Sequence, residues 1–168
     1  KLSRYKRPME AKNASNSKIC FEDFEVGTVR TFGPRLVTRE EIIEFATEFD
    51  PQPMHLDEEA ANKSMLKGLS ASGWHTSAIM MRMVFDGLLQ HAYSLGGPGV
   101  EEMRWVKPLR PGDQITARMT CLEKRESNSR PNMGFVRHSM EITNQNGEVV
   151  LQATWPGMFG KRNPGTPA

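Results

Sequence analysis

The segment from Trp74 to Tyr93 constrains the fold more than any other part of this chain. Its spacing predicts a single helix, roughly 30 Å long at the α-helical rise per residue. Arg82, Asp86 and Gln90 are spaced by four and form one polar stripe, and apolar side chains cover nearly all the rest. A helix that is apolar on most sides must be buried on most sides, so other elements have to wrap around it.

Strands that can wrap this helix follow it in the sequence. Val100 to Lys107 predicts one strand, and apolar residues alternate along 115–121, 136–142 and 149–155, where the last strand is expected to end at Pro156. With one earlier strand at 29–37, the order is strand, helices and four antiparallel strands, an α+β layout. A long helix wrapped by a curved antiparallel β-sheet is the hotdog fold. Such a sheet leaves an exposed edge and face, which dimerisation usually covers.

Length and composition limit the classes of protein that fit. The 168 residues suffice for one domain, expected at 20–160 between a polar basic tail at 1–19 and a tail at 161–168. A net charge of +2 is too small to argue for nucleic acid, and no apolar run reaches membrane-spanning length. Cys20 and Cys121 lack metal or redox spacing, so we expect a reducing compartment, the cytoplasm.

Asp50 stands at an unusual place for an acid. Thr38 and Glu41 match a capping box that opens a helix, and Pro51 forces that helix to stop before it. Asp50 therefore lies at the carboxyl end, where the helix dipole disfavours a carboxylate by roughly 0.3–1 kcal/mol. With partial burial, this position predicts a raised pKa for Asp50. A solvated acid that merely ends the helix fits the same pattern.

The loop after Asp50 carries a histidine in a stiff setting. Pro51 and Pro53 fix the backbone on both sides of Gln52, so Asp50 and His55 are held in fixed relative positions. General acid–base chemistry requires such an arrangement of carboxylate and imidazole. A second acid, Asp57, precedes two glutamates and is predicted to cap the next helix.

Three motifs in order resemble the MaoC-like dehydratases, which include the (R)-specific enoyl-CoA hydratases. They are Asp50-Pro-Gln-Pro-Met-His55, Ala71-Ser-Gly73, and Glu102-Met-Arg-Trp-Val-Lys-Pro-Leu-Arg-Pro-Gly-Asp113. The likeness extends over about 21–159. It implies a hotdog fold and a homodimer, possibly a higher oligomer, with an acyl-CoA thioester entering between subunits.

The resemblance also implies a reaction of fatty acid metabolism. Water adds to a trans-2-enoyl-CoA to give a (R)-3-hydroxyacyl-CoA, or leaves in the reverse direction, with no cofactor besides the CoA thioester substrate. Asp50 matches the catalytic acid of the family, His55 its catalytic histidine, and Gly73 the glycine whose N–H binds the thioester oxygen. We expect Asp50 to act as the main base or acid and His55 to position the water.

The chain departs from the family pattern at three positions. Gln52 replaces the usual asparagine, Ser72 replaces the histidine before the glycine, and Met81 replaces a small polar residue of the central helix. We place Gln52, Pro53, Ser72 and Trp74 among the substrate-binding residues. For Trp74, an ordinary core position fits the sequence equally well.

Other functions remain open at this stage. A hotdog thioesterase typically places an acid on the central helix, where Asp86 is the only candidate and is spaced to pair with Arg82. A non-catalytic acyl-CoA-binding module is the third possibility. His75 and His91 are predicted to be structural or surface residues and His138 a hydrogen-bonded core residue, so no metal site is expected.

Overall fold

The computed structural model of the chain describes residues 18–163, so the predicted tails lie mainly outside the described residues. The strands are β1 (Val29–Leu36), β2 (Glu102–Trp105), β3 (Gln114–Glu126), β4 (Met133–Thr143) and β5 (Val149–Gly160). The α-helices are α1 (Arg39–Phe49), α2 (Pro53–Leu56), α3 (Glu58–Lys63) and α4 (Gly73–Gly87). Two short 3₁₀ helices, η1 (Phe21–Asp23) and η2 (Leu89–His91), complete the order.

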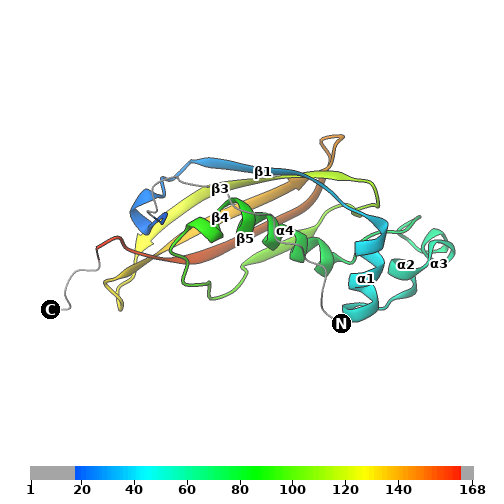
Figure 1. The fold of residues 1–168 in the computed structure, drawn as a ribbon, viewed down its shortest axis with the longest axis horizontal. Coiled ribbons are helices and arrows are strands. Elements are labelled where there is room, and N and C mark those ends of the chain that lie inside the picture. Colours follow the sequence, from blue (N-terminus) through cyan, green and yellow to red (C-terminus); the bar gives the residue numbers. More distant parts are fainter. Residues whose placement is uncertain (1–17, 164–168) are drawn as a thin grey trace, which may run out of the picture.

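The five strands form one antiparallel sheet in the order β1-β3-β4-β5-β2. Helix α4 lies across one face of this sheet, and α1, α2 and α3 gather at one end of it (Figure 1). This arrangement confirms the predicted α+β hotdog fold. None of the helices among residues 18–163 is long and apolar enough to cross a membrane.

The core lies between α4 and the sheet face that it covers. Buried and partly exposed positions alternate along β3 and β4, as the period of two requires. The inward positions of these strands and the buried side of α4 carry apolar side chains: Ile79, Met80, Met83, Val84, Ile115, Ala117, Met119, Val136, Met140 and Ile142. This packing sets the position of α4, and with it the position of the site at the start of that helix.

The central helix is shorter and less enclosed than the sequence predicts. It ends at Gly87 rather than at Tyr93, because Leu88 leaves the helical region at φ −138° and ψ −59°. A Cβ on Gly87 would overlap the ring of Phe32, so the glycine allows β1 to approach the helix closely. One side of α4 is also uncovered in the single chain, with Trp74, Met81 and Phe85 exposed.

The last strand is longer than predicted. It passes through Pro156 and Gly157 and ends at Gly160. β2 pairs with β5 only up to Thr154, so Pro156 lies where that side of β5 has no neighbouring strand. A proline removes no ladder hydrogen bond at such an edge position, which explains why the strand continues.

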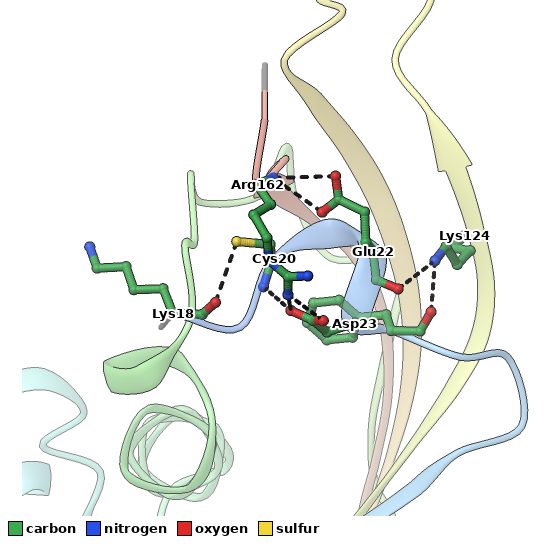
Figure 2. A network of polar contacts seen from close by, with 7 residues as sticks. Lys18, Cys20, Glu22, Asp23, Lys124 and Arg162 are labelled. Atoms are coloured by element: carbon green, nitrogen blue, oxygen red, sulfur yellow. Dashed lines mark hydrogen bonds and ion pairs between the residues drawn. The ribbon is translucent and has the colours of Figure 1, made fainter. Parts of the chain in front are cut away.

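A network of polar contacts holds the first described residues against the sheet (Figure 2). The Asp23 carboxylate accepts hydrogen bonds from Cys20 N–H at 2.8 Å and from Arg162 at 2.6 Å, and these interactions lower its pKa. Lys124 of β3 donates to Phe24 O at 2.8 Å. Residues from both ends of the described chain are thereby joined at the end of the sheet opposite α1.

Shortening a buried side chain of β4 should cause a large loss of stability. Ile142 is fully buried and pairs with Ala117 of β3 and Leu151 of β5. Ile142→Ala removes apolar contacts and leaves a cavity, so the free energy of unfolding should fall by about 2–5 kcal/mol in urea titrations. Ser139→Ala, at a partly exposed position of the same strand, should cost less than about 0.5 kcal/mol. Equal losses in the two variants would contradict this core assignment.

Candidate functional site

Asp50 lies at the carboxyl end of α1, as predicted. Thr38 Oγ1 accepts from Glu41 N–H at 3.2 Å, and Glu41 Oε1 accepts from Thr38 N–H at 2.9 Å, which is the predicted capping box. The helix ends at Phe49, and Asp50 is its C-cap, donating its N–H to Ala46 O at 3.0 Å. The local sequence thus fixes the point at which the acid leaves the helix.

Two side chains donate hydrogen bonds to the Asp50 carboxylate. Ser72 Oγ donates to Oδ2 at 2.5 Å, and Gln52 Nε2 donates to Oδ1 at 2.8 Å. Ser72 is also the N-cap of α4, because its Oγ accepts from Trp74 N–H at 3.2 Å. One buried hydroxyl therefore joins the end of α1 to the beginning of α4.

The expected raised pKa of Asp50 is wrong. The hydrogen bonds from Ser72 and Gln52 lower the pKa, and they outweigh the effect of burial, which raises it. The side chain of Asp50 is only 17% exposed, yet the two donors stabilise its charged form. Asp50 is therefore a carboxylate at neutral pH.

His55 faces the same carboxylate from α2. Pro53 is the first residue of this one-turn helix, so part of the predicted stiff loop is helical. The buried imidazole places Nδ1 2.9 Å from Ser70 O, and Nε2 lies 3.8 Å from Asp50 Oδ2. Because a carbonyl oxygen only accepts, Nδ1 carries a proton, and in the neutral imidazole Nε2 presents a lone pair toward Asp50.

Gly73 is the first residue of α4, directly after Ser72. None of the hydrogen bonds found within residues 18–163 uses its N–H, which is one of the unpaired amides at a helix start. A Cβ at this position would overlap the indole of Trp105, so only glycine allows the ring of Trp105 to lie this close to the helix start. The N–H of Gly73 is therefore available to an acceptor beside Asp50 and His55.

Trp105 of β2 is a residue near the site that the sequence reasoning missed. Its Nε1 donates to Ser77 Oγ at 3.1 Å, and its ring meets Trp74 edge-on at 5.2 Å between centroids. The motif around Trp105 was visible in the sequence, but nothing in it indicated that this edge strand would lie against the start of α4. Trp74 itself is 64% exposed, so a core position for it in the single chain is wrong.

Two cations that follow β2, Lys107 and Arg110, contact other parts of the fold. Arg110 donates to the backbone carbonyls of Leu66, Gly68 and Leu69. Lys107 pairs with Glu148 at 2.5 Å. Within the described residues, no cluster of three or more histidine, cysteine or acidic side chains is placed to hold a metal ion.

The two other inner histidines are buried. His138 lies among the rings of Phe24, Trp155 and Phe159, and its Nε2 has no partner among the described residues, so the hydrogen bond predicted for it is missing at this atom. Burial lowers its pKa to about 4. His75 is also buried, in the first turn of α4.

Comparisons with known proteins agree on one family. A family model described as the MaoC like domain matches residues 23–142. The uncharacterized protein YdeM of Bacillus subtilis is 31% identical over 131 residues, which cover 78% of this chain and 92% of that protein. The chain belongs to the MaoC-like dehydratase family.

Solved structures support the same assignment. A MaoC-like dehydratase from Rhodospirillum rubrum is 40% identical, with a TM-score of 0.78 over 86% of this chain and 99% of that chain. The R-hydratase PhaJ1 from Pseudomonas aeruginosa, at 23% identity, shares the fold with a TM-score of 0.71 over 86% of this chain and 88% of that chain.

The hydrogen bond between Ser72 and Asp50 predicts a measurable change in acidity. Ser72→Ala removes the larger of the two hydrogen-bond effects, so the pKa of Asp50 should rise toward or above its ordinary value of 3.8. Carboxyl-carbon NMR titration measures this pKa directly. Ser139→Ala, outside the site, should leave it unchanged.

The same pKa shift has a defined consequence for stability. Because the pKa of Asp50 is lowered in the fold, its hydrogen bonds contribute their full stabilisation above pH 3.8, and the contribution is lost as the pH falls through the lowered pKa. The stability difference between the unchanged protein and Ser72→Ala should therefore shrink in that acidic range. An unchanged pKa of Asp50 in Ser72→Ala would contradict the account.

Proposed function

We propose that this protein is an acyl-CoA hydratase or dehydratase, which adds water to a trans-2-enoyl-CoA thioester to give a (R)-3-hydroxyacyl-CoA, or catalyses the reverse reaction. The observation that carries the proposal is the gap of 3.8 Å between Asp50 Oδ2 and His55 Nε2, beside the unused N–H of Gly73. This separation is too long for a direct hydrogen bond and suits one bridging water.

Both groups that face this gap are acceptors. Asp50 is a carboxylate, and His55 Nε2 carries a lone pair while Nδ1 donates to Ser70 O. A water between them donates one hydrogen bond to each, which leaves an oxygen lone pair free to attack the β-carbon of the enoyl group. In this scheme Asp50 takes the water proton as the C–O bond forms, and the proton passes on to the α-carbon, so the net change is addition of water.

The start of α4 supports the charge that develops in this reaction. Attack at the β-carbon moves an electron pair to the thioester oxygen as an enolate forms. The Gly73 N–H stands at the positive end of the helix dipole, where a hydrogen bond to that oxygen is strongest in the transition state. Protonation of the α-carbon then restores the carbonyl.

The thioesterase alternative has less support. Asp86, the acid that it would need, pairs with Arg82 at 2.8 Å and is half exposed. It lies thirteen residues after Gly73 on α4, about 20 Å along the helix axis. No acid of the central helix therefore lies beside the residues that converge on Asp50.

The proposal includes a homodimer. An apolar face formed by Trp74, Met81, Phe85, Trp105 and Val106 is exposed in the single chain. Apolar patches of this kind mark interaction surfaces, and β2, which carries Trp105 and is followed by Val106, is an edge strand of the sheet. A second copy that covers this face closes the site at the start of α4, where the acyl-CoA would enter between subunits.

Removal of either catalytic group should abolish hydration. Asp50→Asn removes the proton acceptor and His55→Ala removes the second acceptor for the water, so we expect each to lower kcat/KM by about 100-fold or more. The measurement is loss of the conjugated-thioester absorbance over a panel of trans-2-enoyl-CoA substrates.

Asp86→Asn is the matched control for this experiment. It makes the same chemical change at the other candidate acid, and hydration should survive it. Release of free thiol that depends on Asp86 but not on Asp50 would instead establish a thioesterase.

The dimer proposal predicts a change of mass from one substitution. Met81→Asp places a charge on the apolar face, so it should shift the protein to a monomer in sedimentation velocity and lower hydration activity. Leu122→Asp, at an exposed apolar position of β3 outside that face, should change neither. A Met81→Asp protein that keeps the mass of the unchanged protein in sedimentation velocity, and its activity, would contradict the dimer proposal.

A further inference from the structure

Thr76 is a buried polar residue at the start of a helix whose later buried positions are apolar. It lies in the first turn of α4 and is 4% exposed. The buried positions that follow it on this helix are Ile79, Met80, Met83 and Val84. A valine is branched at the same carbon and would fill the position of Thr76 without a hydroxyl group. Packing alone therefore does not account for the hydroxyl.

The hydroxyl of Thr76 donates a hydrogen bond to the backbone carbonyl of Ser72. Thr76 Oγ1 lies 3.1 Å from Ser72 O, and Thr76 N–H donates to the same oxygen at 3.0 Å. A carbonyl oxygen has two lone pairs, so it accepts both bonds at once. The hydroxyl thus adds a second hydrogen bond to a carbonyl that the helix already satisfies.

Ser72 O and the Gly73 N–H belong to one peptide group. This group is planar, and its carbonyl and its N–H are joined by a bond with partial double-bond character. Hydrogen bonds that the carbonyl accepts draw electrons toward its oxygen and make the N–H of the same peptide a stronger donor. The Gly73 N–H has no acceptor within residues 18–163. Both bonds from Thr76 therefore strengthen the donor that is proposed to bind the thioester oxygen.

The next peptide is held at both of its ends. Ser77 Oγ donates to Gly73 O at 3.0 Å and accepts from Trp105 Nε1 at 3.1 Å. Trp74 N–H, in the same peptide as Gly73 O, donates to Ser72 Oγ at 3.2 Å. The backbone of Gly73 is thus fixed on both sides, and its N–H keeps one direction. A donor of fixed direction needs no reorganisation as charge develops on its acceptor.

We propose that Thr76 is a positioning residue for hydration, whose hydroxyl strengthens and directs the hydrogen bond from the Gly73 N–H to the thioester oxygen. This inference rests on the proposed function, since it takes the thioester to be bound beside Asp50 and His55. The oxygen gains negative charge as the enolate forms, so a stronger donor stabilises the transition state more than the bound substrate. Thr76 acts here through the peptide between Ser72 and Gly73, and not by contact with the substrate.

The carbonyl stretching frequency of a bound thioester tests this hydrogen bond without turnover. Butyryl-CoA labelled with heavy carbon at the thioester carbonyl has no double bond to hydrate, and infrared difference spectroscopy isolates its carbonyl band. Binding to the unchanged protein should lower the frequency, because the Gly73 N–H weakens the C=O bond. Thr76→Val removes the hydroxyl, so the frequency should move back toward that of the free thioester. Thr76→Ser keeps the hydroxyl and should leave the band of the bound ligand unchanged.

Hydration kinetics give a second readout. Thr76→Val should lower kcat by about two- to tenfold and change KM little, because the hydroxyl strengthens a bond that counts most in the transition state. Thr76→Ser should retain most of the activity. Thr47→Val is the matched control, since Thr47 Oγ1 of α1 donates in the same way to Ile43 O, at 2.7 Å. It removes the same kind of bond from a peptide outside the site, so neither kcat nor the carbonyl frequency should change.

Thr76→Ala replaces Thr76→Val if the valine variant does not fold, and the same results are expected of it. Equal carbonyl frequencies in this variant and the unchanged protein, or no shift when butyryl-CoA binds, would overturn the inference. A carbonyl frequency that depends on Thr76, in a protein that hydrates no enoyl-CoA, contradicts the proposed reaction alone. Hydration that is lost in Asp50→Asn but unaffected by removal of the Thr76 hydroxyl contradicts this inference alone.

Discussion

The hydrogen bond from Ser72 Oγ to Asp50 Oδ2 is the contact on which the site depends. It joins the carboxyl end of α1 to the amino end of α4, two helix ends that are 22 residues apart in the sequence. The same hydroxyl caps α4, so the bond fixes both the direction of the carboxylate and the position of the Gly73 N–H. It also lowers the pKa of Asp50, because its effect is larger than that of burial. The chemistry proposed for this protein uses the charged form of this carboxylate.

The sheet provides the second constraint. Strand β2 carries Trp105 to the start of α4, where its ring lies on Gly73 and meets Trp74. The two indoles belong to the apolar face that a single chain leaves exposed. Trp74 and Trp105 therefore contribute both to the surroundings of the site and to the surface proposed for a second subunit. A substitution on this face is expected to affect assembly and catalysis together.

Much of the fold follows from local sequence signals, because these signals act within one element. The capping box of Thr38 and Glu41 with the stop at Pro51 correctly placed Asp50 at a helix end. Alternation of apolar residues correctly indicated the inward faces of β3 and β4. The end of α4 at Gly87 was not predicted, because the apolar pattern continues through Leu88 into the 3₁₀ helix η2 that follows.

Properties of the site that depend on distant partners were beyond the sequence. The direction of the Asp50 pKa shift was predicted wrongly, since it depends on a hydroxyl from a separate helix. The contact of Trp105 with the start of α4 and the burial of His75 against Phe45 likewise depend on how strands and helices pack. Periodicity reports which side of an element is buried, but not which residue of another element it meets.

The central claim is that this site adds water to the β-carbon of an enoyl thioester. The most direct test is to incubate a trans-2-enoyl-CoA with the protein in water labelled with heavy oxygen and to locate the label by mass spectrometry. The account predicts a 3-hydroxyacyl-CoA that carries the label on its hydroxyl group, with the thioester intact. Label found instead in a free carboxylic acid, with release of CoA, would contradict it.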